Sequence, residues 1–308
     1  MKPKFHGLIA APFTAFQADG GLNLGVIEQQ AALLVADGVT GAFVCGTTGE
    51  GLSLTVAERK QVAERWVAAA ARRLKVIVHV GHNSVGEARE LAAHAEKIGA
   101  DALATMGPTF FRPAQAEQLT DFCGRVAEAA RSLPFYYYHI PAMTGLNVPM
   151  IEFLQRASQA IPNFAGLKFT DENLLSYSQC LNFEGGRFDI LFGRDEMLLA
   201  ALAMGATGAV GSTYNFMAPL YRELLAAFGR GDLASARRLQ AAAMQVITVM
   251  LQHGGLPAGK AMMSLIGIDC GPVRPPLRHL SPGEVETLRR ALQPVGFPSP
   301  VRGASHQA

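Results

Sequence analysis

Short apolar runs alternate with longer amphipathic segments from the first residues of the chain to about position 230. This alternation is typical of repeated strand–helix units on a parallel sheet, whose strands are buried on both faces. The apolar runs predict eight strands, at 7–12, 41–45, 75–80, 102–106, 135–139, 164–169, 188–192 and 208–211. Between them, apolar positions at helical spacing predict helices that include 24–37, 55–71, 84–98 and 114–130.

Local signals support the predicted helix starts. Thr55 followed by Glu58 fits a capping box, and Pro149 suits a first helical turn. Eight strand–helix pairs in about 230 residues match a closed barrel better than an open doubly wound sheet, which usually has fewer strands and a nucleotide-binding fingerprint. The predicted fold class is therefore α/β, a (β/α)₈ TIM barrel with a C-terminal helical extension.

The chain after position 230 is predicted to be helical without further strands, at 233–253, around 258–266 and at 281–292. A separate C-terminal domain is the alternative, but so short a run of mostly amphipathic helix would bury little core of its own. We predict a barrel over residues 1–230, helices packed on it over 231–298, and a flexible tail over 299–308.

Composition narrows the class of protein. The 308 residues are 49% hydrophobic and 17% charged, which is material for a large core rather than for a disordered chain. The net charge is +2 and no block of like charge occurs, so no nucleic-acid partner is expected. The uncharged stretch 197–221 is interrupted by glycines and Pro219, which predicts a helix, a buried strand and a loop rather than a membrane span.

The four cysteines, Cys45, Cys123, Cys180 and Cys270, are far apart and include no Cys-x-x-Cys pair. This spacing favours a reducing compartment over a secreted disulfide scaffold. No charged head followed by a long apolar signal segment is present near the N-terminus. A cytoplasmic location without membrane association is therefore expected.

Polar residues gather where the predicted strands end. In barrels of this kind the reactive groups lie at the carboxyl ends of the strands and on the loops that follow. The candidates are Thr47, Thr48 and Glu50 after the second strand, Tyr138 and His139 at the fifth, Lys168 and Thr170 at the sixth, Gly193, Asp195 and Glu196 after the seventh, and Ser212, Thr213 and Tyr214 after the eighth. All are expected to face one mouth of the barrel.

Lys168 is the most specific of these signals, because it lies in the apolar strand sequence Phe-Ala-Gly-Leu-Lys-Phe-Thr. Burial disfavours an ammonium and favours a neutral amine, which can attack a ketone. A lysine that reaches from a strand end to water is the simpler interpretation of the residue taken alone. The same holds for Tyr138, a potential proton shuttle, whose ring could equally be core packing; strand alternation sends Tyr137 to the opposite face.

The segment 46–51, Gly-Thr-Thr-Gly-Glu-Gly, is a glycine-bounded turn that can aim amides and two hydroxyls at a carboxylate. It lacks the lysine of a phosphate-binding loop, and a locally bonded tight turn is the alternative. For Asp195 and Glu196 the alternative is charge at a helix N-terminus. No His, Cys or carboxylate cluster has metal-ligand spacing, so neither a metal nor a cofactor is expected.

Taken together, four motifs resemble the N-acetylneuraminate lyase branch of the dihydrodipicolinate synthase superfamily, over roughly residues 5 to 295. They are Gly-Thr-Thr-Gly-Glu at 46–50, Tyr-His-Ile-Pro at 138–141, Gly-Leu-Lys-Phe-Thr at 166–170 and Gly-Ser-Thr-Tyr-Asn at 211–215. The resemblance implies a class I aldolase, usually a homotetramer, that cleaves N-acetylneuraminate (sialic acid) reversibly to pyruvate and N-acetyl-D-mannosamine without an external cofactor.

Residue roles follow from the resemblance. It implies that Lys168 forms the imine with the 2-oxo acid and that Tyr138 donates and accepts the proton. Thr47 and Thr48 would hold the substrate carboxylate. The positions that contact the sugar-chain hydroxyls would be Thr170, Gly193, Asp195, Glu196 and Ser212.

Two departures from the lysine-pathway synthases favour the lyase branch. Met143 stands where those synthases carry an arginine for a second carboxylate, and a thioether cannot replace that fork of donors. Phe110 stands where they place a tyrosine from a neighbouring subunit. Another lysine-dependent aldolase or dehydratase, for instance for a 2-keto-3-deoxy sugar acid, is the runner-up, and a non-catalytic barrel that binds a 2-oxo acid is the third hypothesis.

Overall fold

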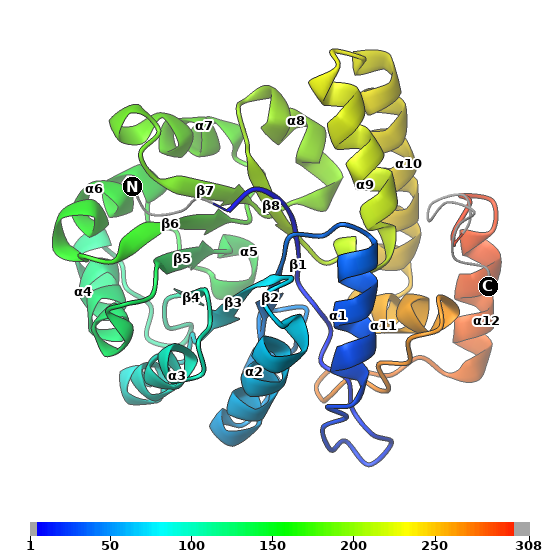
Figure 1. The fold of residues 1–308 in the computed structure, drawn as a ribbon, viewed down its shortest axis with the longest axis horizontal. Helices are drawn as coiled ribbons and strands as arrows, with labels where there is room; N and C mark the ends of the chain where they lie inside the picture. The colour runs from blue at the N-terminus through cyan, green and yellow to red at the C-terminus, as the bar shows by residue number, and fades with distance from the viewer. Residues whose placement is uncertain (1–4, 299–308) are drawn as a thin grey trace.

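Eight parallel strands close into a barrel in sequence order in the computed structural model, which describes residues 5–298 (Figure 1). The strands are β1 (Gly7–Ala10), β2 (Gly41–Val44), β3 (Lys75–His79), β4 (Ala102–Thr105), β5 (Phe135–His139), β6 (Phe164–Phe169), β7 (Asp189–Phe192) and β8 (Gly208–Gly211). The helices are α1 (Val26–Ala36), α2 (Val56–Ala70), α3 (Val85–Lys97), α4 (Ala116–Ala127), α5 (Pro141–Thr144), α6 (Met150–Ala160), α7 (Leu174–Asn182), α8 (Leu198–Ala203), α9 (Tyr214–Gly229), α10 (Leu233–Gln252), α11 (Leu256–Leu265) and α12 (Pro282–Leu292). The predicted barrel is confirmed.

Strand alternation divides the buried residues into two cores. The interior of the barrel holds Phe43, Tyr136 and Tyr138, whereas Tyr137 packs in the layer between strands and helices, against Phe153 of α6. Alternate side chains of one strand point to opposite faces, and this places the phenol of Tyr138 inside the barrel, as predicted.

The C-terminal helices pack on the barrel layer through α9 and α10 (Figure 1). The capping box predicted at Thr55 and Glu58 is present at the start of α2. One local prediction was wrong: after β8 the chain enters α9 at Tyr214 rather than a loop, and the backbone kinks at Met217, shortly before Pro219. The glycine and proline signals thus marked a kinked helix start. The predicted tail 299–308 lies outside the described residues.

No helix within residues 5–298 is long and apolar enough to cross a membrane. The stretch 197–221 contains α8, β8 and the first turns of α9.

Candidate functional site

Lys168 lies inside the barrel on β6, with only 4% of its surface exposed. Its Nζ atom is 3.8 Å from the ring centroid of Tyr138 and 4.1 Å from that of Phe43. The two aromatic faces line the position of the amine and keep bulk water from it. Register explains the arrangement, because Lys168 pairs with Tyr138 on β5.

Tyr138 joins this amine to the loop after β2. Its hydroxyl is 3.2 Å from Oγ1 of Thr47, and either atom can donate the proton. The Thr47 side chain is exposed and Thr48 beside it is half-buried, so both hydroxyls border the barrel mouth. An amine, a phenol and an exposed hydroxyl therefore lie in sequence along one wall, an arrangement suited to proton transfer next to a nucleophile.

His79 at the end of β3 is a site neighbour that the sequence reasoning missed. Its ring meets Tyr138 edge-on at 5.6 Å, and its Nδ1 lies 3.0 Å from the carbonyl oxygen of Cys45. Burial, reinforced by the positive charge of Arg59, holds the pKa of His79 well below its ordinary range. The ring is therefore neutral at physiological pH. Its position at the end of a predicted strand was the available signal.

Arg59 of α2, buried behind these strands, was also missed. Its guanidinium donates to the carbonyl oxygens of His79 and Gly81, at 2.6 and 2.8 Å. These bonds fix the end of β3 against α2. An arginine in an amphipathic helix usually faces water, so no sequence pattern marked this one.

A buried carboxylate forms the opposite wall of the mouth. Oδ2 of Asp195 accepts hydrogen bonds from the amide and the hydroxyl of Thr213, at 2.8 and 2.6 Å. Burial raises the pKa of Asp195 to about 6, although both hydrogen bonds act in the opposite direction. Gly211 makes this approach possible, because a Cβ atom there would lie 2.0 Å from Oδ1 of Asp195.

Asp195 and Glu196 do lie in the first turn of a short helix, as the alternative interpretation expects, but the Asp195 carboxylate is oriented by Thr213. The short helical turn Asp195–Met197 has Arg194 at its N-cap and no side-chain cap. Glu196 instead pairs with Arg194, whose other nitrogen pairs with Glu172, at 3.1 and 2.8 Å. The acidic residues are thus held by neighbours at the ends of β6 to β8.

The remaining predicted residues follow the same strand ends. Thr170 and Gly193 are in contact, since a Cβ at Gly193 would lie 2.0 Å from Oγ1 of Thr170. Ser212 directly follows β8, and all three are half-buried. Nε2 of His139 lies 3.3 Å from Oδ2 of Asp171, and burial lowers the pKa of the histidine, so the contact supports a structural interpretation of His139.

Glu50 borders the pocket beside Thr47, but its carboxylate has a partner in the C-terminal helices. Its carboxylate is buried and paired with Lys260 of α11 at 2.8 Å. No metal site competes for these groups: among residues 5–298, no three His, Cys, Asp or Glu side chains gather closely enough to hold an ion.

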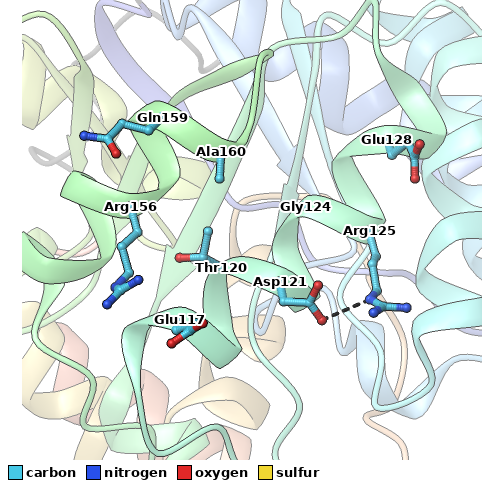
Figure 2. A pocket seen from close by; sticks show the side chains of 9 residues that line it. All are labelled: Glu117, Thr120, Asp121, Gly124, Arg125, Glu128, Arg156, Gln159 and Ala160. Carbon is cyan, nitrogen blue, oxygen red and sulfur yellow. Dashed lines mark hydrogen bonds and ion pairs between the residues drawn. The ribbon is translucent and has the colours of Figure 1, made fainter.

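One hollow adjoins the mouth, and the groove between α4 and α6 lies outside it. A pocket of about 340 Å³ adjoins Thr47 and His79 and is bordered by the exposed Met143. A wider groove of about 620 Å³ lies between α4 and α6 on the outer helical layer, where Asp121 and Arg125 pair (Figure 2). That groove mixes exposed charges of both signs and contains no lysine, so it offers no amine nucleophile.

Comparison with known proteins identifies the family of the chain. Residues 4–295 match the model of the dihydrodipicolinate synthetase family. N-acetylneuraminate lyases of Mus musculus and Homo sapiens are each 45% identical, over 98% and 96% of this chain and 97% and 94% of theirs.

Solved structures extend the likeness to the fold. N-acetylneuraminate lyase of Proteus mirabilis superposes with a TM-score of 0.94 at 45% identity, covering 96% of this chain and all of the other. That of Aliivibrio salmonicida gives 0.93 at 42% identity, covering 96% of this chain and 98% of the other. The chain therefore belongs to the dihydrodipicolinate synthetase family, on its N-acetylneuraminate lyase branch.

Proposed function

We propose that this protein is a Schiff-base aldolase that cleaves N-acetylneuraminate reversibly to pyruvate and N-acetyl-D-mannosamine. The observation that carries the proposal is the buried Lys168 amine, 3.8 Å from the Tyr138 ring, with the Tyr138 hydroxyl 3.2 Å from Thr47. The activity named for relatives at 45% identity supplies the substrate. A barrel that only binds a 2-oxo acid has no need of an amine and a phenol so placed.

In this mechanism Lys168 attacks the C2 ketone of the open-chain sugar acid, and water leaves to give a protonated imine. The imine is an electron sink for the pair released when the C3–C4 bond breaks. The Tyr138 hydroxyl relays the proton lost from the C4 hydroxyl, in contact with Thr47. The aldehyde of N-acetylmannosamine departs, and the enamine left on Lys168 takes a proton at C3. Hydrolysis of the imine then releases pyruvate and restores the amine.

Substrate binding is assigned to the two walls of the mouth. Thr47 and Thr48 hold the carboxylate. The sugar-chain hydroxyls are held by Thr170, Gly193, Asp195, Glu196 and Ser212. Asp195 suits this role because its buried carboxylate is oriented by Thr213.

The experiment is pyruvate release from N-acetylneuraminate, followed with a coupled dehydrogenase. We expect turnover in the parent protein and a loss of at least about a thousandfold in Lys168→Met, because the covalent step disappears. Unchanged turnover in that variant contradicts the mechanism. No turnover in either protein favours the runner-up, and a screen of 2-keto-3-deoxy sugar acids then identifies the substrate.

The homotetramer and the cytoplasmic location stay predictions. The exposed side chains of Phe110 and Phe111, 78% and 85% accessible, are consistent with burial between subunits. Light scattering coupled to gel filtration measures the assembly directly.

A further inference from the structure

A buried ion pair lies behind the loop that carries Thr47 and Thr48. The side chains of Glu50 and Lys260 are each 1% exposed, and Oε1 and Nζ are 2.8 Å apart. Lys260 belongs to α11, in the helices that follow the barrel. Its Nζ also donates to the carbonyl oxygen of Pro272 and lies 4.3 Å from the ring centroid of Phe16. The mechanism proposed above uses neither charge.

Glu50 ends the loop in a conformation that its surroundings enforce. Its backbone φ is 52°, in the left-handed region that few residues other than glycine adopt. Its amide donates to the carbonyl oxygen of Thr47, and that of Gly51 donates to Gly46, both at 3.0 Å. A Cβ at Gly51 would lie 1.9 Å from the carbonyl oxygen of Cys45. The loop is thus closed on itself, and the Glu50 carboxylate anchors it from outside.

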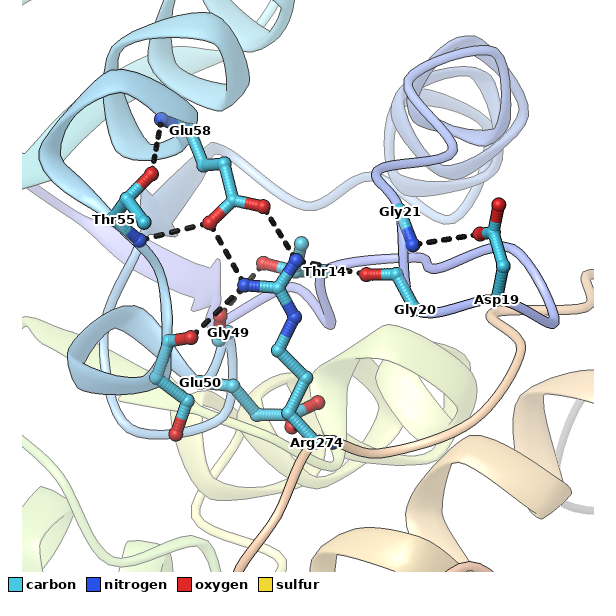
Figure 3. A network of polar contacts seen from close by, with 10 residues as sticks. Thr14, Asp19, Gly20, Gly21, Gly49, Glu50, Thr55, Glu58 and Arg274 are labelled. Carbon is cyan, nitrogen blue, oxygen red and sulfur yellow. Dashed lines mark hydrogen bonds and ion pairs between the residues drawn. The ribbon is translucent and has the colours of Figure 1, made fainter.

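Arg274, in the segment between α11 and α12, forms a second attachment. Its amide donates to Oε2 of Glu50 at 2.8 Å, and its guanidinium binds both carboxylate oxygens of Glu58 (Figure 3). It also donates to the carbonyl oxygens of Ser53 and Gly20. Figure 3 shows the side chain reaching from the C-terminal segment toward the start of α2. The C-terminal segment therefore holds the loop from two sides.

Removing one member of a buried pair leaves the other charge uncompensated, and the structure relaxes by moving that charge toward water. Here the movable partner is Glu50, three residues from Thr47 and two from Thr48. A displaced Glu50 shifts both hydroxyls relative to Lys168. Small displacements of positioning groups are costly for binding and catalysis.

We propose that Lys260 is a positioning residue for the 2-oxo acid carboxylate: through Glu50 it fixes the loop that presents Thr47 and Thr48. The inference rests on the proposed function of that loop. It makes α11 part of the active-site architecture, because Lys260 of α11 acts on the loop through Glu50. A pair that serves only stability would not distinguish the two substrates of the condensation reaction.

The test compares Lys260→Met with the parent in the condensation direction. We expect the pyruvate concentration that gives half-maximal borohydride trapping to rise about tenfold, and the KM for N-acetylmannosamine to change less than about twofold. Lys60→Met is the matched control, because Lys60 pairs with Glu90 at the surface. That control should leave both values at those of the parent.

Glu50→Gln keeps the test decisive if Lys260→Met does not fold. The amide side chain of this variant retains an acceptor for the Arg274 amide, and Lys260 keeps Pro272 and Phe16. We expect the pyruvate concentration for half-maximal trapping to rise less than in Lys260→Met, about threefold. Equal changes for both substrates, or no change in either folded variant, overturn the proposal. Absence of any trapping in the parent overturns the proposed function instead.

Discussion

The two walls of the barrel mouth each contain a buried carboxylate, but different interactions hold the two carboxylates in place. Behind the loop after β2, Glu50 is a buried carboxylate neutralised by the ammonium of Lys260. At the end of β7, Asp195 is a buried carboxylate oriented by an amide and a hydroxyl of Thr213, and its pKa is raised to about 6. The charge of Glu50 is compensated by a direct ionic partner, whereas the neutral donors at Asp195 orient its carboxylate without compensating the charge, and burial then raises its pKa.

This difference matches the proposed function, in which the two walls bind different parts of the substrate. In the proposed binding mode every 2-oxo acid presents the same carboxylate to Thr47 and Thr48, so that wall gains from rigidity. The sugar chain varies among substrates, and the wall around Asp195 is expected to decide which chain is accepted. We call the loop with Thr47 and Thr48 the first wall and the residues around Asp195 the second wall. A substitution in the first wall should therefore weaken pyruvate binding, and one in the second wall should weaken binding of the intact sugar acid.

Among the residues around Lys168, Tyr138→Phe should give the largest effect, because Tyr138 carries the proposed proton relay. Loss of the hydroxyl removes the proton relay and its contact with Thr47. We expect kcat for N-acetylneuraminate to fall by about 10² to 10³. Tyr137→Phe, at the neighbouring position that faces out of the barrel, is the matched control, and steady-state kinetics of both variants measure the contrast. A fall in kcat of similar size in Tyr137→Phe would contradict the assignment of the proton relay to Tyr138.

Gly211→Ala should damage only the second wall. The added Cβ would lie 2.0 Å from Oδ1 of Asp195 and so displaces the carboxylate. We expect the KM for N-acetylneuraminate to rise about tenfold or more, with pyruvate trapping unchanged. Gly283→Ala is a suitable control, since nothing lies within 4 Å of a Cβ there. Weaker pyruvate trapping in Gly211→Ala speaks against two separable walls.

The raised pKa of Asp195 predicts a pH dependence confined to the same wall. Below pH about 6 the carboxylate takes up a proton and loses acceptor strength, so the KM for N-acetylneuraminate should rise as pH falls. The pyruvate concentration for half-maximal trapping should not change over this pH range, and Asp195→Asn should abolish the pH dependence of the KM for N-acetylneuraminate.

The same shift predicts how stability depends on pH. The pKa of Asp195 is higher in the folded than in the unfolded protein, so Asp195 favours folding at acid pH, and this contribution is lost as pH rises toward 6. A pH profile of kinetics and of thermal unfolding measures both.

Ser212→Ala should have the smallest effect. It removes one neutral hydroxyl from the second wall without adding volume. We expect the KM for N-acetylneuraminate to rise about fivefold and kcat to stay near that of the parent, as for loss of one hydrogen bond. A change in the pyruvate concentration for half-maximal borohydride trapping would instead place Ser212 on the first wall.

The sequence predicted the elements whose signal is local. Period-two alternation placed Tyr138 inside the barrel and Tyr137 outside, and the spacing of Thr55 and Glu58 predicted a real capping box. Lys168 was recognisable because a lysine in an apolar strand is costly. These inferences need only neighbours along the chain.

Contacts between segments that are far apart in the sequence could not be predicted from the sequence alone. Nothing near Glu50 in sequence indicates that Lys260 neutralises it, and nothing near Asp195 indicates that Thr213 replaces helix capping as its partner. Arg59 likewise resembles an ordinary surface arginine until the fold buries it. Such pairings depend on how the closed barrel brings its strand ends and its C-terminal helices together.

The most direct test of the account is reduction of the protein with borohydride in the presence of pyruvate, followed by peptide mass mapping. The account predicts one covalent adduct, on the peptide that contains Lys168, and none in Lys168→Met. An adduct on Lys260, the other lysine buried within residues 5–298, or no adduct in the parent protein, would contradict it.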